Sequence, residues 1–588
     1  MDEYETPALA VRVLTGGLAD MVVENAAADP GAVAIAVRSG GTWRDVSAGE
    51  FRDAVVGLAK GLLANGIGAG DRVGLMSRTR YEWTLFDYAL WMIGACPVPV
   101  YPTSSPGQVE WILSDSEAVA CVVETGDNAA AVESVRAELP KLREVWTVDA
   151  GAVAELTDAG ADVADDDVER RRSAVAPDDP ATIVYTSGTT GRPKGCVLTH
   201  RNFLDEVDNA TELLYPVFRA HSKRAASTVV FVPLAHVLGR MLQVGCVRAG
   251  VRMGHEPSMS TDTLRDALRT FRPTFVVAVP YVFEKIHTTA RQTAERMGRA
   301  ASFDRAARVA RQWGEALERD PEHARGAGIG LRLAHRLYDV LVYRRIRRQV
   351  GGRLRYAICG GSRLSRDLAL FFAGAGIVIY EGYGLTETTG AATVNPPLAP
   401  RFGTAGKPLP GTAVRIAGDG VILLRGGQVF GSYWNDPGAS AEALDDGWFR
   451  TGDTGELDDD GYLTITGREK DLLVTASGKN VAPGPLEDVI RAHPLVSQCL
   501  VIGDDRPFVA ALVTLDADAS PDDPAVTDEI GKAVAEANAT VSRAESIREF
   551  RVVEGDFTEE NGLLTPSLKV KRKAVLEAYA DVVKEIYG

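Results

Sequence analysis

The sequence is short of cysteine and of long apolar runs. Its 588 residues include six cysteines, scattered without the C-x-x-C spacing of structural zinc or redox sites. Most of them lie in apolar surroundings, which predicts buried free thiols in a reducing compartment. The most apolar early stretch, residues 88–101, is short and broken by Pro97 and Pro99, so we do not expect it to span a bilayer. Residues 1–5 are acidic and lack the apolar core of a signal peptide, and a cytoplasmic location is expected.

The chain also lacks an excess of basic residues. It carries 64 lysines and arginines against 80 aspartates and glutamates, a formal net charge of −16. General nucleic-acid binding favours basic surfaces, so this balance argues against a nucleic-acid partner. A hydrophobic fraction of 45% with 24% charged residues is typical of a soluble globular protein. At 588 residues the chain exceeds one ordinary core, and at least two domains are expected.

What the sequence does contain is a loop rich in glycine and hydroxyl residues at 185–195, which reads YTSGTTGRPKG. Glycine lets backbone N–H groups approach an anion, hydroxyls add donors, and Lys194 adds positive charge, so the loop is predicted to bind phosphate. The residues concerned are Thr186, Ser187, Gly188, Thr189, Thr190, Gly191 and Lys194. The order differs from the phosphate loop G-x-x-x-x-G-K-[ST], because no hydroxyl residue follows the lysine. The alternative interpretation is an ordinary surface turn.

Alternating helix and strand patterns surround this loop. Capping boxes at Ser47 with Glu50 and at Ser105 with Gln108 predict two helix starts. Short apolar runs rich in β-branched residues predict buried strands between the helices. The clearest of them are residues 73–76, 118–123, 181–184, 228–232, 274–279 and 356–359. Strands and helices that alternate at this spacing indicate a parallel α/β arrangement.

The pattern changes twice towards the C-terminus, and these changes set the expected domains. Residues 403–466 read as short strands with turns, and the chain after residue 467 mixes helices and strands. The predicted fold is α/β, with a large N-terminal domain of layered α/β subdomains plus a small β-barrel-like subdomain. A small mobile α+β C-terminal domain follows. We place the N-terminal domain at 1–466, a hinge at 467–471 and the C-terminal domain at 472–588.

Two segments are marked by charge. Residues 162–172 are acidic at one end and basic at the other, and we interpret them as a solvated linker. Residues 281–350 are helical in pattern and end in the basic run YRRIRR at 343–348. Such a run is ordinarily a solvated helix face. The two functional alternatives are peripheral contact with anionic lipid headgroups, at the inner face of a membrane, and contact with the phosphates of a nucleotide thiol.

The loop at 185–195 resembles the signature loop of the adenylate-forming superfamily of AMP-binding enzymes, which includes acyl-CoA synthetases, peptide-synthetase adenylation domains and beetle luciferases. Further motifs of that family follow in the same order and cover most of the chain. Residues 380–388, YEGYGLTET, match its second strong motif. The resemblance implies that Tyr383 lies against adenine, that Thr386 contacts phosphate, and that Glu387 and Thr186 help hold Mg²⁺. The other nucleotide contacts implied in this motif are Glu381, Gly382 and Gly384.

Three more segments resemble the family's nucleotide-binding motifs. The turn that holds adenine corresponds to Gly360, Gly361 and Ser362, and Arg363 follows where many relatives have proline. Residues 451–453, TGD, resemble the ribose motif and place Asp453 on the ribose hydroxyls. Residues 467–471, GREKD, resemble the hinge motif, with Arg468 on the ribose and Lys470 as the pivot.

The resemblance also implies the catalytic residues. Lys569 corresponds to the family's catalytic lysine, although Leu568 stands where many relatives have glycine, and Lys571 is the alternative assignment. Residues 231–240, FVPLAHVLGR, resemble the motif at the acyl pocket and place His236 near the substrate carboxylate, whereas a lone histidine is more often structural. Arg240 stands where some fatty-acid enzymes have a gating tryptophan. The expected catalytic set is Lys569, His236, Thr386 and Glu387.

Residues 81–85, 101–105 and 111–115 look like those of long-chain fatty acyl-CoA synthetases. The function this implies is activation of a long-chain fatty acid by ATP and Mg²⁺ to acyl-AMP, followed by transfer to coenzyme A with release of AMP and pyrophosphate. One rival is a fatty acyl-AMP ligase that loads an acyl carrier protein, because it would share every nucleotide motif. A second rival is an inactive nucleotide-binding or scaffold protein. The sequence leaves acyl chain length, oligomeric state and regulation open.

Overall fold

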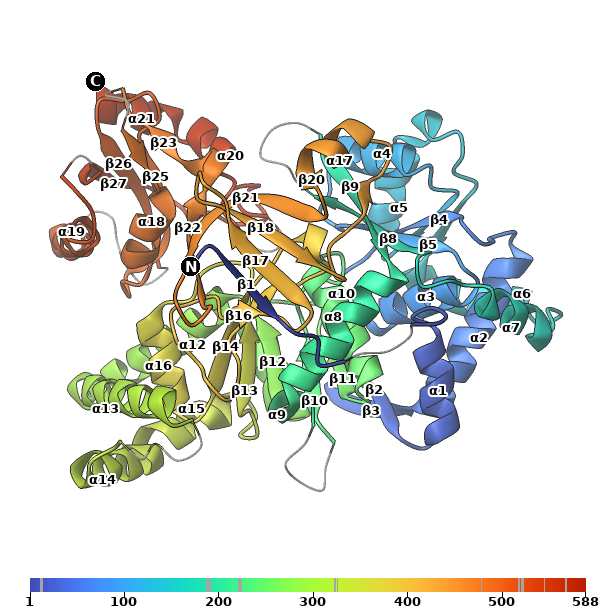
Figure 1. The fold of residues 1–588 in the computed structure, drawn as a ribbon, viewed down its shortest axis with the longest axis horizontal. Helices are drawn as coiled ribbons and strands as arrows, with labels where there is room; N and C mark the ends of the chain where they lie inside the picture. Colours follow the sequence, from blue (N-terminus) through green and yellow to red (C-terminus); the bar gives the residue numbers. More distant parts are fainter. Residues whose placement is uncertain are drawn as a thin grey trace.

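A computed structural model gives the structure of the chain. It describes residues 1–588 except 11–13, 187–191, 220–224, 322–323, 325, 477–478, 517–518, 520–522, 544 and 566–567. The part of the chain coloured blue through yellow to light orange forms the body of the molecule (Figure 1). The part coloured red, near the C-terminus, lies against one end of that body.

The first layer of the body is a parallel sheet built from short apolar strands. Three of its four strands are almost entirely buried, as strands covered on both faces require. The spatial order is β5 (Cys96–Val100), β4 (Arg72–Met76), β6 (Ala120–Val123) and β7 (Glu144–Thr147). The helices of this part are α2 (Ala48–Ala64), α3 (Tyr81–Met92), α4 (Pro106–Asp115), α5 (Gly126–Glu133), α6 (Ala152–Ala159) and α7 (Asp165–Ser173). Both predicted capping boxes are present, at the starts of α2 and α4.

Two further sheets lie side by side in the second part of the body. The backbone N–H of Thr274 donates to the Ser227 carbonyl at 2.8 Å, which joins the start of one sheet to the other. The first has the order β10 (Ser227–Val230), β11 (Arg252–His255), β2 (Val33–Ser39) and β3 (Thr42–Ser47). The second has the order β12 (Phe275–Ala278), β13 (Tyr356–Cys359), β14 (Val378–Tyr383), β15 (Thr393–Val394) and β16 (Lys407–Pro408). The helices here include α1 (Asp20–Ala28), α8 (His200–Leu213), α9 (Tyr215–Phe218), α10 (Val237–Arg248), α11 (Thr261–Phe271) and α16 (Arg366–Gly374).

The segment between β12 and β13 is helical, as predicted. Its helix α13 packs closely on α16, because Gly314 and Gly374 leave no room for a side chain where the two helices meet: a Cβ at Gly374 would lie 1.9 Å from the Ala310 carbonyl oxygen. The helical elements are α12 (Pro280–Arg296), α13 (Ala300–Arg319), α14 (Ile329–Tyr338), the π-helical turn η3 (Asp339–Tyr343) and α15 (Arg344–Gln349).

The predicted barrel-like subdomain is a six-stranded antiparallel sheet. It includes β1, from the very start of the chain, which pairs with β17 so that Glu3 lies opposite Arg415. A small apolar cluster around Val414, Ile422 and Leu463 fills its inner side. The strands are β1 (Glu3–Thr6), β17 (Thr412–Ile416), β18 (Val421–Gly426), β20 (Leu444–Asp445), β21 (Trp448–Leu457) and β22 (Leu463–Arg468).

The C-terminal part is α+β, as predicted. Its central sheet has two apolar clusters, which contain Val501 and Leu500 respectively, residues whose side chains alternate along the strand. The described strands are β23 (Leu473–Val474), β24 (Asn480–Val481), β25 (Val496–Ile502), β26 (Val509–Leu515) and β27 (Ile547–Val552). The helices are α18 (Pro483–Arg491), α19 (Pro524–Asn538), α20 (Arg572–Ala578) and α21 (Ala580–Tyr587).

The interpretation of residues 162–172 as a linker is wrong. Residues 165–173 form α7, with three aspartates in the first turn and three arginines in the last. This order suits a helix, because acidic side chains stabilise the positive end of the helix dipole and basic side chains the negative end. Val168 is buried and anchors the helix, and Arg172 pairs with Asp20.

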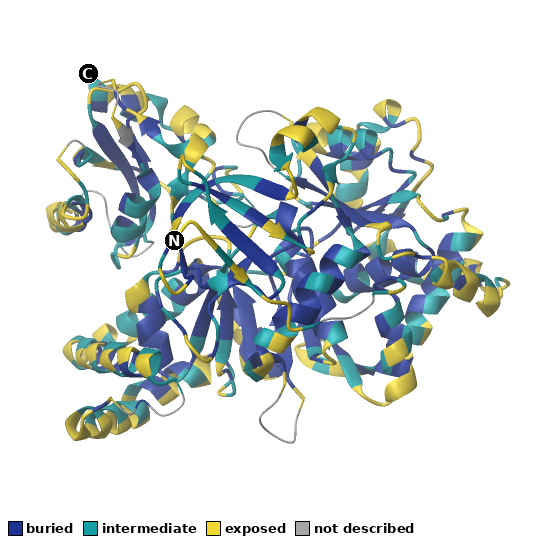
Figure 2. Cartoon of the chain, in the orientation of Figure 1, coloured by how far each residue is buried: buried dark blue, intermediate teal, exposed yellow. Residues whose placement is uncertain are grey.

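The prediction that the cysteines are buried, free thiols is confirmed. All six cysteines, each of which the structure describes, are buried and free. Within the described part of the chain, every helix is too short or too polar to cross a membrane. Figure 2 shows that the buried residues follow the sheets and the helices packed on them.

Candidate active site

The signature loop connects the two strands of a hairpin. β8 (Pro180–Thr186) and β9 (Lys194–Thr199) are antiparallel, with Thr186 opposite Lys194. The Thr186 hydroxyl is 3.4 Å from the Lys194 carbonyl oxygen. The predicted phosphate contacts Ser187, Gly188, Thr189, Thr190 and Gly191 lie outside the described residues. The hairpin therefore fixes both ends of the loop and places Thr186 beside Lys194.

Two tryptophans hold the returning strand of this loop. The indole N–H of Trp111 donates to the Pro193 carbonyl at 2.8 Å, and the backbone N–H of Trp434 donates to the Gly195 carbonyl at 2.7 Å. The Trp434 indole in turn donates to the carbonyl of Asp115 at 2.9 Å. The 111–115 segment, noted in the sequence for its resemblance to long-chain enzymes, thus supports the base of the signature loop.

Lys194 and Glu387 are connected through a tyrosine. The ammonium of Lys194 lies 5.2 Å from the centre of the Tyr433 ring, and the Tyr433 hydroxyl donates to Oε1 of Glu387 at 2.8 Å. Glu387 belongs to the short helical turn η4 (Thr386–Thr388) and is buried, and burial raises the pKa of its carboxyl group, partly offset by the Tyr433 hydrogen bond. One buried carboxylate close to a lysine is suited to a metal–phosphate complex, because Mg²⁺ takes one or two carboxylates and fills its other positions with phosphate oxygens and water.

Tyr433 escaped the sequence analysis. It lies in β19 (Ser432–Tyr433), a strand of two residues that pairs with β9, and only this pairing brings it to Glu387. Neither its spacing from residues 380–388 nor a periodic pattern marks it. Only the fold could identify it.

Asp453 is shared by two of the predicted nucleotide contacts. Its Oδ2 accepts a hydrogen bond from the Tyr383 hydroxyl at 2.7 Å, and its Oδ1 accepts one from Nε of Arg468 at 2.6 Å. The second contact follows from strand register, since Asp453 on β21 lies opposite Arg468 on β22. Asp453 is buried. Three residues chosen from separate motifs therefore meet at one carboxylate.

Lys569 reaches the body of the molecule from the C-terminal part. It lines a small cavity of about 20 Å³ together with His236, Gly361 and five other residues, all but Lys569 from the body. The pKa of Lys569 is lowered, mainly because surrounding protein displaces water and also because Arg468 repels the ammonium. By its surface area Lys569 is exposed, so the residue keeps contact with solvent although protein surrounds much of its side chain.

A tight hairpin presents this lysine. Leu564 forms an isolated bridge with Val570, and the Thr565 hydroxyl accepts a hydrogen bond from the Lys569 backbone N–H at 3.0 Å. Leu568 has a φ of +61°, in the left-handed region that favours glycine. This conformation explains why glycine suits the position before the lysine. Leu568 also packs against one apolar cluster of the body and one of the C-terminal part.

His236 is the N-cap of α10, and its ring is held in one orientation. Its Nδ1 accepts a hydrogen bond from the Leu238 backbone N–H at 3.2 Å. Burial, and to a smaller degree Lys569, lowers the pKa of the ring to about 4, so it is neutral at pH 7. With Nδ1 as an acceptor, the proton of the neutral ring is on Nε2, which can donate to an oxygen of a ligand. Arg240, in the next turn, is fully buried and paired with Asp87, so its guanidinium is held inside the protein.

The glycine-rich segments and Glu381 lie around the same region. Gly361 has a φ of +89° and lines the cavity with Lys569, and Ser362 is exposed beside it. The backbone N–H of Leu364 donates to Oε1 of Glu381 at 3.0 Å, and burial raises the pKa of this carboxyl to about 8. Glu381 is thus directed at the protein backbone of the 360–364 turn.

The backbone around the glycines of the 380–388 motif is closely packed. A Cβ at Gly384 would lie 1.7 Å from the Gly390 carbonyl oxygen, and one at Gly382 would lie 2.8 Å from the Thr393 carbonyl oxygen. Both glycines therefore allow two stretches of backbone to approach each other. Thr386 begins η4 next to Glu387 and is half-buried. Lys470 follows β22 in the turn η5 (Glu469–Asp471) and is exposed.

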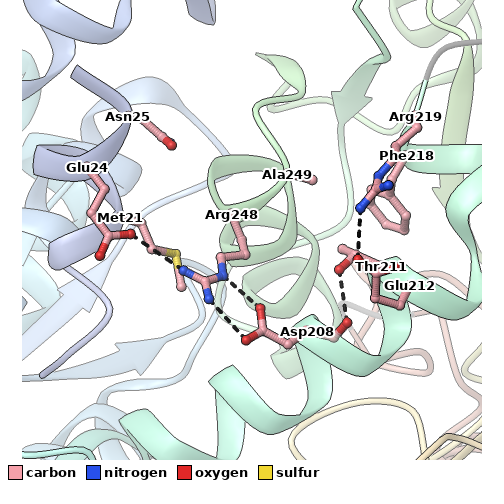
Figure 3. A pocket seen from close by; sticks show the side chains of 10 residues that line it. All are labelled: Met21, Glu24, Asn25, Asp208, Thr211, Glu212, Phe218, Arg219, Arg248 and Ala249. Carbon is pink, nitrogen blue, oxygen red and sulfur yellow. Dashed lines mark hydrogen bonds and ion pairs between the residues drawn. The ribbon is translucent and has the colours of Figure 1, made fainter. Parts of the chain in front are cut away.

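A second, polar cavity lies elsewhere in the molecule. It has a volume of about 300 Å³ and is lined by residues of α1, α8, α9 and α10 (Figure 3). Arg248 forms two hydrogen bonds with Asp208, at 2.7 and 3.0 Å, and Arg219 pairs with Glu212 at 2.8 Å. None of the predicted site residues lines it. Although it is the larger cavity, its charged groups are engaged with one another, and the chemistry is better placed at Lys569.

Comparison with known proteins identifies the family of the chain. The sequence profile for AMP-binding enzymes matches residues 22–434, and the profile for the C-terminal domain of these enzymes matches residues 470–588. The chain belongs to the AMP-binding enzyme family. This AMP-binding enzyme is 44% identical to the long-chain-fatty-acid–CoA ligase FadD15 of Mycobacterium bovis over 609 aligned residues, which cover 100% of both chains. It is 27% identical to the long-chain-fatty-acid–CoA ligase ACSBG2 of Xenopus laevis, over 94% of this chain and 81% of the relative.

Solved structures share the fold of this AMP-binding enzyme. An anthranilate CoA ligase in complex with anthranoyl-AMP matches it with a TM-score of 0.72 at 20% identity, over 96% of this chain and 98% of the other. A fatty acyl CoA synthetase from Mycobacterium tuberculosis matches it with a TM-score of 0.64 at 23% identity, over 96% and 99%. The predicted fold, a large N-terminal domain with a separate α+β C-terminal domain, is confirmed.

Proposed function

We propose that this AMP-binding enzyme is a long-chain fatty acid–CoA ligase, which converts a fatty acid, ATP and coenzyme A into acyl-CoA, AMP and pyrophosphate. The full-length similarity to enzymes named as such ligases supports the reaction class and the long acyl chain. The observation that carries the proposal is the position of Lys569 in one cavity with His236 and Gly361. This position joins the predicted acyl, nucleotide and catalytic motifs at one point.

The first step joins two anions, and the site supplies positive charge where they meet. The fatty-acid carboxylate attacks the α-phosphate of ATP, the bond to the pyrophosphate oxygen breaks, and acyl-AMP forms. The ammonium of Lys569 would stabilise the charge that accumulates between carboxylate and α-phosphate. Nε2–H of His236 would donate to the carboxylate or the acyl oxygen, which orients it for attack.

The nucleotide would be held from both ends. Lys194 and the loop after Thr186 would bind the β- and γ-phosphates, while Thr386 would contact phosphate and Asp453 with Arg468 would bind the ribose. Tyr383 would lie against adenine, which the turn at Gly360, Gly361 and Ser362 would border. Glu387 and Thr186 are the residues that would hold Mg²⁺, which would neutralise phosphate charge when bound.

The second step requires a path for the thiol of coenzyme A. Attack of the thiol on the acyl-AMP carbonyl expels AMP and forms the thioester. We assign the N-terminal domain to 1–466, the hinge to 467–471 and the C-terminal domain to 472–588. Rotation about Lys470 would withdraw Lys569 and open the acyl carbonyl to the thiol. The exposed position of Lys470 in a short turn suits a pivot.

The decisive experiment is product analysis by mass spectrometry, with ATP, Mg²⁺, coenzyme A and a series of fatty acids from short to very long. We expect acyl-CoA with a maximum at long chains. Acyl-AMP that accumulates without thioester would instead identify an acyl-AMP ligase that requires a carrier protein. The absence of both products would contradict the proposal.

The buried, unpaired thiols also support a reducing, cytoplasmic location.

A further inference from the structure

A row of apolar side chains is exposed along α14 and η3. Among the residues that the structure describes, thirteen large apolar side chains are exposed, and five of them lie in this short segment. They are Ile329 (78% exposed), Leu333 (61%), Leu337 (56%), Val340 (56%) and Leu341 (45%). Their spacing of about four residues places them on one face of the helix. We call this row, with the arginines beside it, the α14 face.

The opposite side of the helix fixes this orientation. The His335 ring stacks on Trp313 of α13 with 4.0 Å between ring centres, and its Nε2 lies 2.7 Å from the Gly374 carbonyl oxygen. At the end of η3, the Tyr343 hydroxyl donates to the Ala306 carbonyl at 2.7 Å. Leu331 packs against α13 in a small cluster. The helix is therefore anchored from behind, and its apolar row cannot turn inward.

Arginines flank the apolar row. Arg332, Arg336, Arg344, Arg345 and Arg348 are all exposed. Residues 326–350 contain six arginines and a single acidic residue, Asp339, so the segment carries a net charge of +5 in a chain whose net charge is −16. Asp339 pairs with Arg347 at 2.6 Å and with Arg344 at 3.4 Å. The α14 face is thus both apolar and strongly basic.

The face is also placed to meet a flat partner. Figure 1 shows α14 at the edge of the molecule, beyond α13 and away from the sheets. In the same view, Figure 2 shows exposed residues along α13 and α14. A protruding helix of this kind can touch a surface without hindrance from the rest of the body.

We propose that the α14 face docks this enzyme reversibly on a lipid bilayer that contains anionic lipid. Helices that lie in the membrane interface combine an apolar face with flanking basic side chains, which reach up to the headgroups. Ile329, Leu333 and Leu337 would enter the boundary of the acyl chains, while the arginines would bind headgroup phosphates. The biological role of this docking rests on the proposed function, because a long apolar acyl chain partitions from water into a bilayer.

The charge of the face decides between a membrane and a second copy of the chain. A symmetric dimer through this face would bring its arginines against the same arginines of the partner, and like charges in contact oppose association. An anionic bilayer presents the complementary charge over an extended plane. The remainder of the molecule is acidic and would be repelled, which leaves α14 as the side that approaches.

The test is flotation of the full-length protein with unilamellar vesicles of phosphatidylcholine, with and without phosphatidylglycerol. Binding is expected only with phosphatidylglycerol, and it should weaken as salt is raised. Leu333→Gln and Leu337→Gln should each lower the partition coefficient about tenfold, because each removes a leucine from the interface. Leu398→Gln is the matched control, since Leu398 is 78% exposed and lies outside the face.

The charge contribution needs its own pair of variants. Arg344→Gln with Arg345→Gln should lower the partition coefficient about fivefold for each arginine removed. Arg170→Gln with Arg171→Gln is the control, because these two arginines are also adjacent, exposed and on a helix. All four sites are on the surface, and unchanged unfolding temperatures would confirm that the variants fold.

Two results would overturn the inference. One is equal flotation of the wild-type protein and the leucine variants. The other is a protein that does not bind vesicles but forms a concentration-dependent dimer, measured by analytical ultracentrifugation, which Leu333→Gln abolishes. Ligase activity on a long-chain fatty acid supplied in detergent micelles, without vesicles, separates this inference from the proposed function. Vesicle binding without any ligase activity would support membrane docking by the α14 face and contradict the ligase function. Ligase activity without vesicle binding would support the ligase function and contradict the docking.

Discussion

At the scale of single residues, we predict opposite outcomes for substitution of Lys569 and of Lys571: the first should impair acyl-AMP formation and the second should not. Lys569→Ala should lower acyl-AMP formation by about a hundredfold or more, because it removes the positive charge at the reacting oxygens. Conversion of supplied acyl-AMP to acyl-CoA should continue. Exchange of labelled pyrophosphate into ATP measures the first step, and thioester formation from synthetic acyl-AMP measures the second.

Lys571→Ala is the matched control. Lys571 is exposed, two residues further along the same segment, and its backbone N–H donates to the Leu563 carbonyl, so the hairpin survives the change. We expect both half-reactions to proceed normally in this variant. If Lys571→Ala lost pyrophosphate exchange and Lys569→Ala kept it, the assignment of the catalytic lysine would be reversed.

Glu206 of α8 predicts a pH dependence of stability. Its Oε1 accepts a hydrogen bond from the Ala391 backbone N–H at 2.6 Å, and its buried Oε2 has no hydrogen-bond partner among the described residues. Burial raises the pKa of this carboxyl from 4.5 to about 8. The folded protein therefore holds a proton that the unfolded chain releases, so the stabilisation is full below pH 4.5 and is lost as pH rises through about 8.

Glu206→Gln should remove this dependence, because glutamine keeps the acceptor and does not titrate. Between about pH 5 and about pH 8, the wild-type protein should lose up to about 1.4 kcal/mol per pH unit relative to the variant. Urea unfolding midpoints across that range measure the difference. Glu133→Gln, at an exposed site, is the control and should run parallel to the wild type. A Glu206→Gln curve parallel to the wild type as well would show that the proton is not held there.

Single residues were also where the sequence was least informative. The motifs predicted Asp453, Tyr383 and Arg468 separately, but the shared carboxylate depends on strand register and on the packing of β14 near β21. Tyr433 and the backbone contact of Glu381 were not foreseen, because both depend on partners distant in the sequence. A local pattern encodes which residue types are present and does not encode which of them meet.

At the scale of elements, the hairpin at 564–570 stores strain. Leu568 adopts a left-handed conformation that costs a non-glycine residue about 1 kcal/mol. Leu568→Gly should relieve that cost but lose apolar contacts on both sides. Leu568→Ala loses most of the same contacts and keeps the strain. We therefore expect the glycine variant to be about 1 kcal/mol more stable than the alanine variant, measured by thermal or urea unfolding.

Both variants should slow the first half-reaction more than the second, since the proposed rotation would withdraw Leu568 from the body together with Lys569. Pyrophosphate exchange and thioester formation report on the two steps separately. Equal slowing of both steps would mean that Leu568 acts through stability alone. Greater stability of the alanine variant would contradict the backbone argument.

Elements were predicted best where the signal is local. The capping boxes of α2 and α4 and the apolar runs of β4, β6 and β13 correspond to observed starts or strands. α7 was missed because only Val168 marks a buried face, and charge was taken as a sign of a linker. The order of its charges, acidic first and basic last, was the signal that could have identified it.

At the scale of the whole molecule, a few polar contacts join the C-terminal part to the body. The Lys285 ammonium lies 3.1 Å from Oδ2 of Asp516, and the Thr103 hydroxyl donates to Oε1 of Glu559 at 2.8 Å. If Lys569 must dock for the first half-reaction, these contacts favour it. Lys285→Gln should slow acyl-AMP formation about threefold, as expected for loss of one partly exposed ion pair, and leave thioester formation unchanged.

Lys532→Gln is the control, because Lys532 is exposed and pairs with Glu529 inside the C-terminal part. Steady-state exchange rates at low salt measure the effect, and the difference should fade at high salt. Faster acyl-AMP formation in Lys285→Gln would indicate that the contact opposes docking.

The strand β1 has a consequence for the order in which the protein is made. Glu3 to Thr6 pair with residues 412–416, and the side chain of Arg415 donates to Glu3 across 412 positions of sequence. At synthesis rates of about 5–20 residues per second, β1 is made about 20 to 80 s before its partner strand. During that interval its edge is open to other chains, and an N-terminal extension added for purification would be attached to this waiting strand. β1 therefore reaches its place in the sheet only after the 405 residues that separate it from β17 have been made.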